Sequence, residues 1–148
     1  MFHGENHWLE VASLGLDLAA ETPDVDRMVL VLFAVLHDAR RIGDDHDPQH
    51  GERAAALARS LDLGRFGVRE EQLAVLEIAC RDHTTGGVNN DPTIGTCWDA
   101  DRLLLWRVGI TPDARYMSTT VGRRAAASGH RRSGQAGSWS DIAASLEA

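Results

Sequence analysis

Apolar side chains recur with the period of an α-helix along most of this 148-residue chain. The first such pattern runs from Glu5 to about Ala20. Positions spaced at i, i+4, i+7 and i+11 predict a helix with one buried stripe. The side chains of that stripe are His7, Val11, Leu14 and Leu18. His7 is therefore expected to point into the protein.

Four more helices are predicted over about residues 23–41, 48–60, 69–82 and 93–107. Thr22 and Asp47 each precede a proline, the arrangement expected of an N-cap followed by the first helical residue. Residues 28–36 are apolar nearly all round, so the second helix is expected to be largely buried. No stretch shows the alternation of a strand, and the chain is therefore predicted to be all-α.

The helical pattern weakens after Pro112. A short helix is expected within 113–120, and Ser140 is expected to cap a last one over 141–147. Residues between them, 128–138, are rich in Gly, Ser and Arg and are predicted to be mobile. The sequence thus predicts a helical domain over 1–112 and a partly mobile C-terminal extension over 113–148.

Length and charge narrow the functional classes. A chain of 148 residues fits one domain with a real core. A net charge of −7 argues against binding a nucleic-acid polymer, and all basic residues are arginine, which excludes a lysine Schiff base.

No apolar run reaches the roughly 18 residues of a membrane span, and the first residues do not resemble a signal peptide. The protein is expected to be cytoplasmic, with Cys80 and Cys97 as buried thiols.

Candidate chemistry gathers in residues 36–53, which hold three of the seven histidines and five acidic residues. His37 and Asp38 lie at the C-terminal end of the predicted second helix, directly after its apolar run, and Asp101 lies on the inward stripe of the fifth. A carboxylate on an apolar stripe is costly unless it is paired or bound to a cation. Together with His7, these residues predict a divalent metal site whose mixed nitrogen and oxygen ligands suit Mn, Fe, Zn, Co or Ni.

This order of residues resembles the HD domain superfamily of metal-dependent phosphohydrolases. The resemblance covers about residues 3–110 and depends on the sequences His-Trp-Leu-Glu-Val at 7–11, Val-Leu-His-Asp at 35–38 and Ala-Asp-Arg-Leu at 100–103. It implies a single-domain helical bundle, HD-type over 1–112, with a metal at its centre. The primary ligands that it implies are His7, His37, Asp38 and Asp101.

Two ligand positions have competitors nearby. His3 competes with His7, which is preferred because it lies on the helical stripe and because Val11 follows it, as is usual in the family. Asp99 competes with Asp101, which is preferred for its Ala-Asp-x-Leu setting.

The resemblance assigns His46, His50 and His83 to a second metal or to the substrate phosphate. The cofactor implied is one divalent ion, or two, from Mn, Fe, Zn, Co, Ni or Mg. Many members contain His-Asp-x-Gly-Lys, whereas this chain has Arg40 and Arg41 in the last two places. Since a guanidinium presents a flat fork to phosphate oxygens, these arginines are predicted to bind substrate.

The function implied is hydrolysis of a small phosphorylated molecule, with a nucleotide among the candidates. A metal-activated water would attack phosphorus while Asp38 holds the metal and orients the water. His46, His50 or His83 would protonate the leaving oxygen. Two alternatives are a di-iron oxygenase on the same scaffold and a non-catalytic, metal-stabilised module that binds a nucleotide or a protein. No membrane partner is expected, and the oligomeric state is open, a homodimer included.

Overall fold

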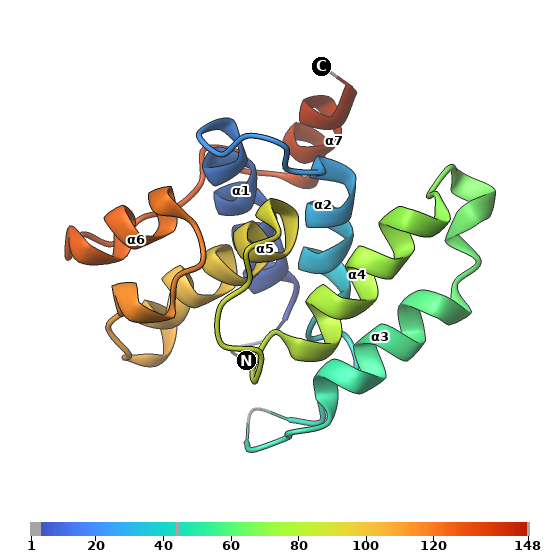
Figure 1. Cartoon of the computed structure of the whole chain (residues 1–148), viewed down its shortest axis with the longest axis horizontal. Helices are drawn as coiled ribbons and strands as arrows, with labels where there is room; N and C mark the ends of the chain where they lie inside the picture. The colour runs from blue at the N-terminus through green and yellow to red at the C-terminus, as the bar shows by residue number, and fades with distance from the viewer. Residues whose placement is uncertain (1–3, 44, 148) are drawn as a thin grey trace.

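Helices are the only regular elements in residues 4–43 and 45–147, the part of the chain that the computed structural model describes. The predicted all-α, single-domain class is thereby confirmed. Among these described residues, no helix combines the length and the apolar character that a membrane crossing requires. Helix α5 (Pro92–Leu103) lies in the middle of the bundle, with α3 and α4 on one side and α6 on the other (Figure 1).

Helices α1 (Glu5–Ala20) and α2 (Arg27–Leu36) pack against each other and against α5. The α1 bounds agree with the prediction. The predicted start of α2 at Pro23 is wrong, because Asp24 has a left-handed φ of 66° and Asp26 caps the helix by accepting from the Val29 amide. The helix also ends at Leu36, and the chain turns through the next four residues.

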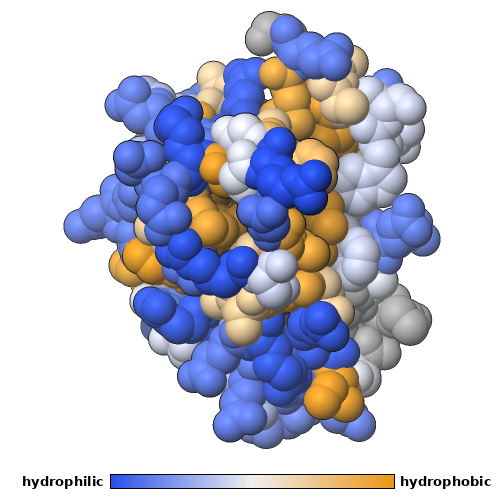
Figure 2. Space-filling view, turned by 90° about the vertical axis from the view of Figure 1, so that its right-hand side faces the viewer, coloured by the Kyte–Doolittle hydropathy of each residue, from blue (hydrophilic) through white to orange (hydrophobic). Residues whose placement is uncertain are grey.

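Burial of α2 is less complete than its composition predicts. Phe33 and Leu30 are fully buried in the core, whereas Val31 and Val35 are half-buried and Met28 is exposed. Figure 2 shows the right-hand side of the molecule, where hydrophobic surface gathers in the middle of a largely hydrophilic face. One side of an apolar helix can thus remain at the surface when no neighbouring element covers it.

Helices α3 (His50–Ser60) and α4 (Glu70–Asp82) lie side by side and are joined by the 3-10 helix η1 (Leu63–Phe66) (Figure 1). The two helices pack closely at Gly51, since a Cβ there would lie 2.5 Å from the carbonyl oxygen of Arg81. The α3 helix begins at His50 and not at Pro48, and Gln49 is its N-cap. This start places His50 in the first turn, facing α4.

The chain beyond α5 packs back on α1, α2 and α5. It forms η2 (Leu104–Val108), η3 (Ala114–Tyr116), α6 (Thr120–Ala127) and α7 (Trp139–Glu147). Helix α6 contacts α5, and α7 contacts α1 and α2, where Ile142 is buried. The sequence pattern missed α6 and placed the start of α7 two residues too late.

Candidate metal centre

The ends of five helices bring histidines and carboxylates to one place. His7 lies in the first turn of α1, His37 and Asp38 directly follow α2, and His50 begins α3. His83 follows α4, and Asp101 lies near the end of α5. All of them are buried except Asp101, whose side chain is 19% exposed. Ionisable groups buried at this density require partners of opposite charge.

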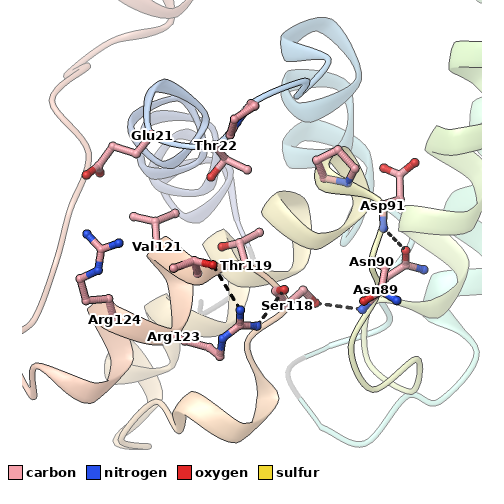
Figure 3. Close-up of a pocket in the computed structure, with 13 residues that line it drawn as sticks. Glu21, Thr22, Asn89, Asn90, Asp91, Ser118, Thr119, Val121, Arg123 and Arg124 are labelled. Atoms are coloured by element: carbon pink, nitrogen blue, oxygen red, sulfur yellow. Dashed lines mark hydrogen bonds between the residues drawn. The ribbon is translucent and has the colours of Figure 1, made fainter.

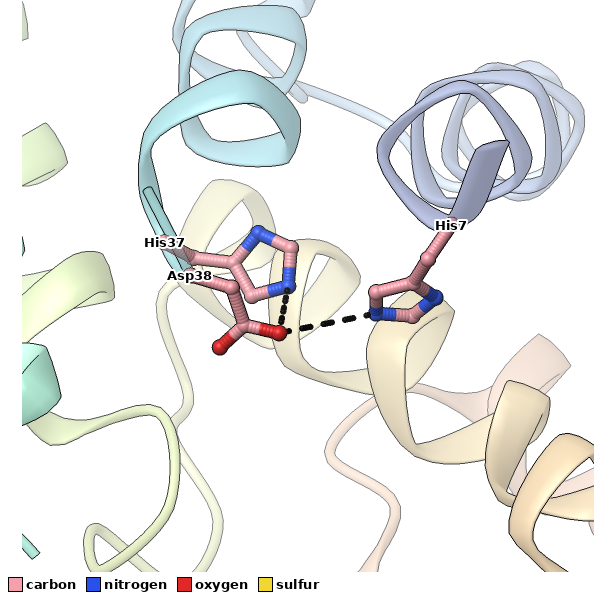
Figure 4. A group of neighbouring side chains, drawn as sticks. All are labelled: His7, His37 and Asp38. Carbon is pink, nitrogen blue, oxygen red and sulfur yellow. Dashed lines mark ion pairs between the residues drawn. The ribbon is translucent and has the colours of Figure 1, made fainter. Parts of the chain in front are cut away.

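The first group contains the four predicted primary ligands. His37 and His7 point toward the Asp38 carboxylate from α2 and α1 (Figure 4). Their Nε2 atoms lie 3.4 Å and 3.9 Å from Asp38 Oδ2. Asp101 Oδ1 lies 3.0 Å from His7 Nε2 and 3.4 Å from His37 Nε2. Two imidazoles and two carboxylates therefore surround one point.

In the second group, the imidazoles of His50 and His83 face the other carboxylate oxygen of Asp38. Asp38 Oδ1 lies 3.2 Å from His50 Nε2 and 3.5 Å from His83 Nε2. The two imidazole nitrogens are 3.0 Å apart. Each group places three ligand atoms within 4.8 Å of one another, which is close enough to hold an ion.

Backbone carbonyls orient three of these imidazoles. The Nδ1–H of His37 donates to Phe33 O at 3.0 Å, that of His50 to Asp47 O at 2.6 Å, and that of His83 to Cys80 O at 2.7 Å. These bonds direct each Nε2 toward the carboxylates, as carbonyl partners do behind metal-binding histidines. The buried Nε2 of His37 faces the carboxylates of Asp38 and Asp101 at 3.4 Å from each.

The electrostatics of the cluster favour ionised carboxylates. Burial opposes the charge on Asp38, but hydrogen bonds from His50 and His83 hold its pKa well below the usual range. The pKa of Asp101 is lowered in the same way, against burial, by His37 and His7. Burial likewise opposes the charge on His37, yet the two carboxylates raise its pKa to about 8. A cation entering the first group would replace that proton.

Two predicted site residues lie outside the cluster. His46 is exposed in the segment between α2 and α3 and belongs to neither group, although His50 follows four positions later. Arg40 is also exposed and lies in the turn that follows Leu36. Arg41 lies at the second group instead, with Nη1 3.2 Å from the ring nitrogens of His50 and Nη2 donating to Asp45 O.

Of the two aspartates that compete for one ligand position, only Asp101 faces the cluster. Asp99 accepts from the amides of Ser118 and Thr119 and from the Thr119 hydroxyl, and it therefore anchors α6. Burial raises its pKa although these bonds oppose the shift. Asp101 faces the cluster, whereas His3 lies outside the described residues.

The cysteines are buried and unpaired, as predicted. Burial raises the pKa of Cys80 to about 12 and that of Cys97 well above its ordinary value. Neither belongs to a metal-capable group within the described residues. Both are therefore core thiols.

A cavity of about 600 Å³ opens beside the cluster. His83 and Asp101 form part of its lining, and Arg102 forms another part. Sequence reasoning did not find this cavity, because its other walls come from the loop between α4 and α5 and from the segment after α5, where the helical pattern is weak.

A separate cavity of about 360 Å³ carries none of the cluster residues (Figure 3). Its polar groups are largely used by the fold: Arg123 donates to Ser118 O and Thr120 Oγ1, and Ser118 Oγ accepts from the Asn89 amide. The cavity therefore adds no group to the candidate metal centre.

Comparison of the chain with protein-family models, with curated proteins and with solved structures finds no match. The resemblance to the HD superfamily rests on the sequence motifs alone. The geometry supports a candidate metal centre formed by two groups of buried histidines around a shared aspartate.

Proposed function

We propose that this protein is a metal-dependent phosphohydrolase that cleaves a phosphate ester of a small molecule. The observation that carries the proposal is the position of Asp38 between the two groups. Its Oδ2 atom faces His7 and His37, while Oδ1 faces His50 and His83. A carboxylate with histidines on both sides can serve one ion or two.

The donor set fits a divalent transition metal. The first group offers His7, His37, Asp38 and Asp101, and the second offers Asp38, His50 and His83. Imidazole and carboxylate together suit Mn, Fe, Co, Ni or Zn better than Mg, which prefers oxygen ligands. Three imidazoles are held by backbone carbonyls, which reduces the reorganisation that binding requires.

A divalent ion held by these residues would lower the pKa of bound water toward neutrality and would polarise a phosphoryl oxygen. Arg41 is the cation of this chain best placed to bind the phosphate, since its guanidinium lies beside His50. If only the first group is occupied, the Nε2 atoms of His50 and His83 can deliver a proton to the leaving oxygen. His46 and Arg40 receive no role, because both are exposed and lie outside the cluster.

The test is elemental analysis of the full chain purified without an affinity tag, followed by a phosphomonoester screen with the identified metal. We expect one or two Mn, Co, Ni or Zn ions per chain and turnover that His37→Ala abolishes. His130→Ala is the matched control, because His130 is exposed and lies in neither group. Absence of metal after reconstitution, or metal without turnover of any ester, would contradict the proposal.

The shared aspartate also fits a di-iron oxygenase, which is the second candidate function. That function requires iron in both groups and consumption of oxygen. Two irons per chain with oxygen uptake, and without phosphate release, would favour it over hydrolysis.

A further inference from the structure

Two residues of the candidate metal centre also line the cavity of about 600 Å³. His83 and Asp101 contribute to the cluster and to the cavity lining. His83 Nε2 lies 3.5 Å from Asp38 Oδ1, and Asp101 Oδ1 lies 3.0 Å from His7 Nε2. A molecule whose phosphate lies at the cluster would therefore extend the rest of its structure into this space.

Four large apolar or aromatic side chains line the cavity. They belong to Leu105, Ile110, Tyr116 and Met117. Ile110 and Tyr116 are 51% and 57% exposed, so neither serves the core. Large apolar side chains left at the rim of a cavity are typical of a ligand site, where a few polar groups set the orientation. The hydroxyls of Thr84, Thr85 and Thr111 supply such groups here.

The charges around the cavity disfavour a second anionic group. Arg102, the one arginine among its lining residues, donates to the carbonyls of Gly87, Tyr116 and His83, and its guanidinium lies 5.1 Å from the centre of the Trp98 ring. Its guanidinium therefore serves mainly to hold the wall together.

Asp113 also lines the cavity and accepts from Arg115 at 2.7 Å. That bond lowers the pKa of Asp113 and pairs its carboxylate with the Arg115 guanidinium, which lies 5.7 Å from the centre of the Tyr116 ring. Because Arg102 bonds three carbonyls and Arg115 bonds Asp113, an additional anionic group on the substrate would find no unpaired arginine at the described residues that line the cavity.

We propose that the substrate is a phosphate monoester whose leaving group is an uncharged, mainly apolar ring bound in this cavity. The inference rests on the proposed function for the chemistry at the phosphate. The cavity supplies the selectivity: the ring contacts Ile110 and Tyr116, while its polar substituents bond the threonine hydroxyls.

The first experiment compares two esters on the metal-loaded full chain. In Ile110→Ser/Tyr116→Ser, kcat/KM for 1-naphthyl phosphate should fall about tenfold or more, because apolar contact area is lost. For ethyl phosphate, whose two-carbon group offers little apolar area for contact, kcat/KM should change by less than about twofold. The control Leu61→Ser/Phe66→Ser removes exposed apolar side chains outside the cavity and should alter neither ester. Equal loss for both esters, or no loss, would overturn the inference.

A second comparison tests charge with two esters of matched shape. We expect 4-carbamoylphenyl phosphate to be cleaved with a kcat/KM at least about tenfold above that of 4-carboxyphenyl phosphate, because only the latter adds a carboxylate. A preference for the carboxylate would overturn the charge argument.

Binding of 1-naphthol, followed by its fluorescence, separates the cavity from the chemistry. Weaker binding to Ile110→Ser/Tyr116→Ser supports the cavity as a ring site, even if no ester is cleaved and the hydrolase proposal fails. Equal binding to the variant and the unmodified chain would overturn the ring site, even if esters are cleaved.

Discussion

Asp38 Oδ1 lies 3.2 Å from His50 Nε2, across the interface between the end of α2 and the start of α3. The other oxygen of the same carboxylate lies 3.4 Å from His37 Nε2. One side chain thus joins two metal-capable groups that would otherwise be independent. Its loss should therefore affect both groups at once.

Asp38→Asn should abolish metal binding at both groups, because an amide removes the negative charge that each would use. We expect the affinity for Mn or Zn to fall by at least about 100-fold, with no ion retained after gel filtration. Elemental analysis of the variant provides the measurement. Asp62→Asn is the control, since Asp62 is exposed and lies outside both groups. Retention of one ion by the Asp38 variant would show that the groups do not share this ligand.

His50→Ala and His46→Ala should differ sharply although the two histidines are four positions apart. His50 is buried in the second group, whereas His46 is exposed. His50→Ala is expected to lower the affinity for an ion at the second group by at least about tenfold and to leave the affinity at the first group unchanged. His46→Ala should leave metal content and turnover within about twofold of the original. An equal effect of both substitutions, measured by calorimetric metal titration, would rule out this assignment.

Metal affinity should rise with pH until His37 is deprotonated. Asp101 and Asp38 overcome the effect of burial and raise the pKa of His37 to about 8 in the metal-free chain. Below that pH an ion must displace a proton, so its apparent affinity should rise up to about tenfold per pH unit and level off above about 8. Titration calorimetry in buffers of different ionisation enthalpy measures the proton released. A metal affinity that does not change between about pH 6 and 8 would contradict the expectation.

Arg53 is expected to position His50 without touching it. Its guanidinium bonds the Asp47 carboxylate and the carbonyl of Arg40, and the Asp47 carbonyl accepts from His50 Nδ1 at 2.6 Å. Arg53→Met should therefore lower the affinity of the second group for a metal ion by about tenfold, as the loss of a supporting hydrogen bond does in metal sites. Arg59→Met is the control on the same helix, since Arg59 bonds only Glu70 and Glu77 within the described residues. Equal metal affinity of the two variants would argue against this role.

Gly51→Ala should destabilise the contact between α3 and α4. A methyl group there would lie 2.5 Å from Arg81 O and 2.8 Å from Cys80 O. The helices must separate, which should lower the free energy of unfolding of the metal-free chain by about 1–3 kcal/mol. Gly64→Ala, which meets nothing within 4 Å, should change it by less than about 0.5 kcal/mol. Urea unfolding compares the two, and equal stability would contradict the packing argument.

The helical class and most helix positions follow from the sequence, because period and capping are local properties. Helix α1 has the predicted bounds, and α4 begins one residue later than predicted. Helix α6 escaped prediction for a tertiary reason. It is short, and Asp99 anchors its start by accepting from Ser118 and Thr119, about 20 positions away along the chain.

The sequence by itself determined which residue types are available for metal chemistry, and it placed His7, His37, Asp38 and Asp101 on inward positions. Tertiary structure decided which histidines join them. His83 and His50 reach Asp38 because α3 and α4 pack closely at Gly51, whereas His46 remains outside because α3 begins only at His50. The sequence gives the type of each side chain, but whether these side chains meet at one site depends on where each helix ends and on what packs against it.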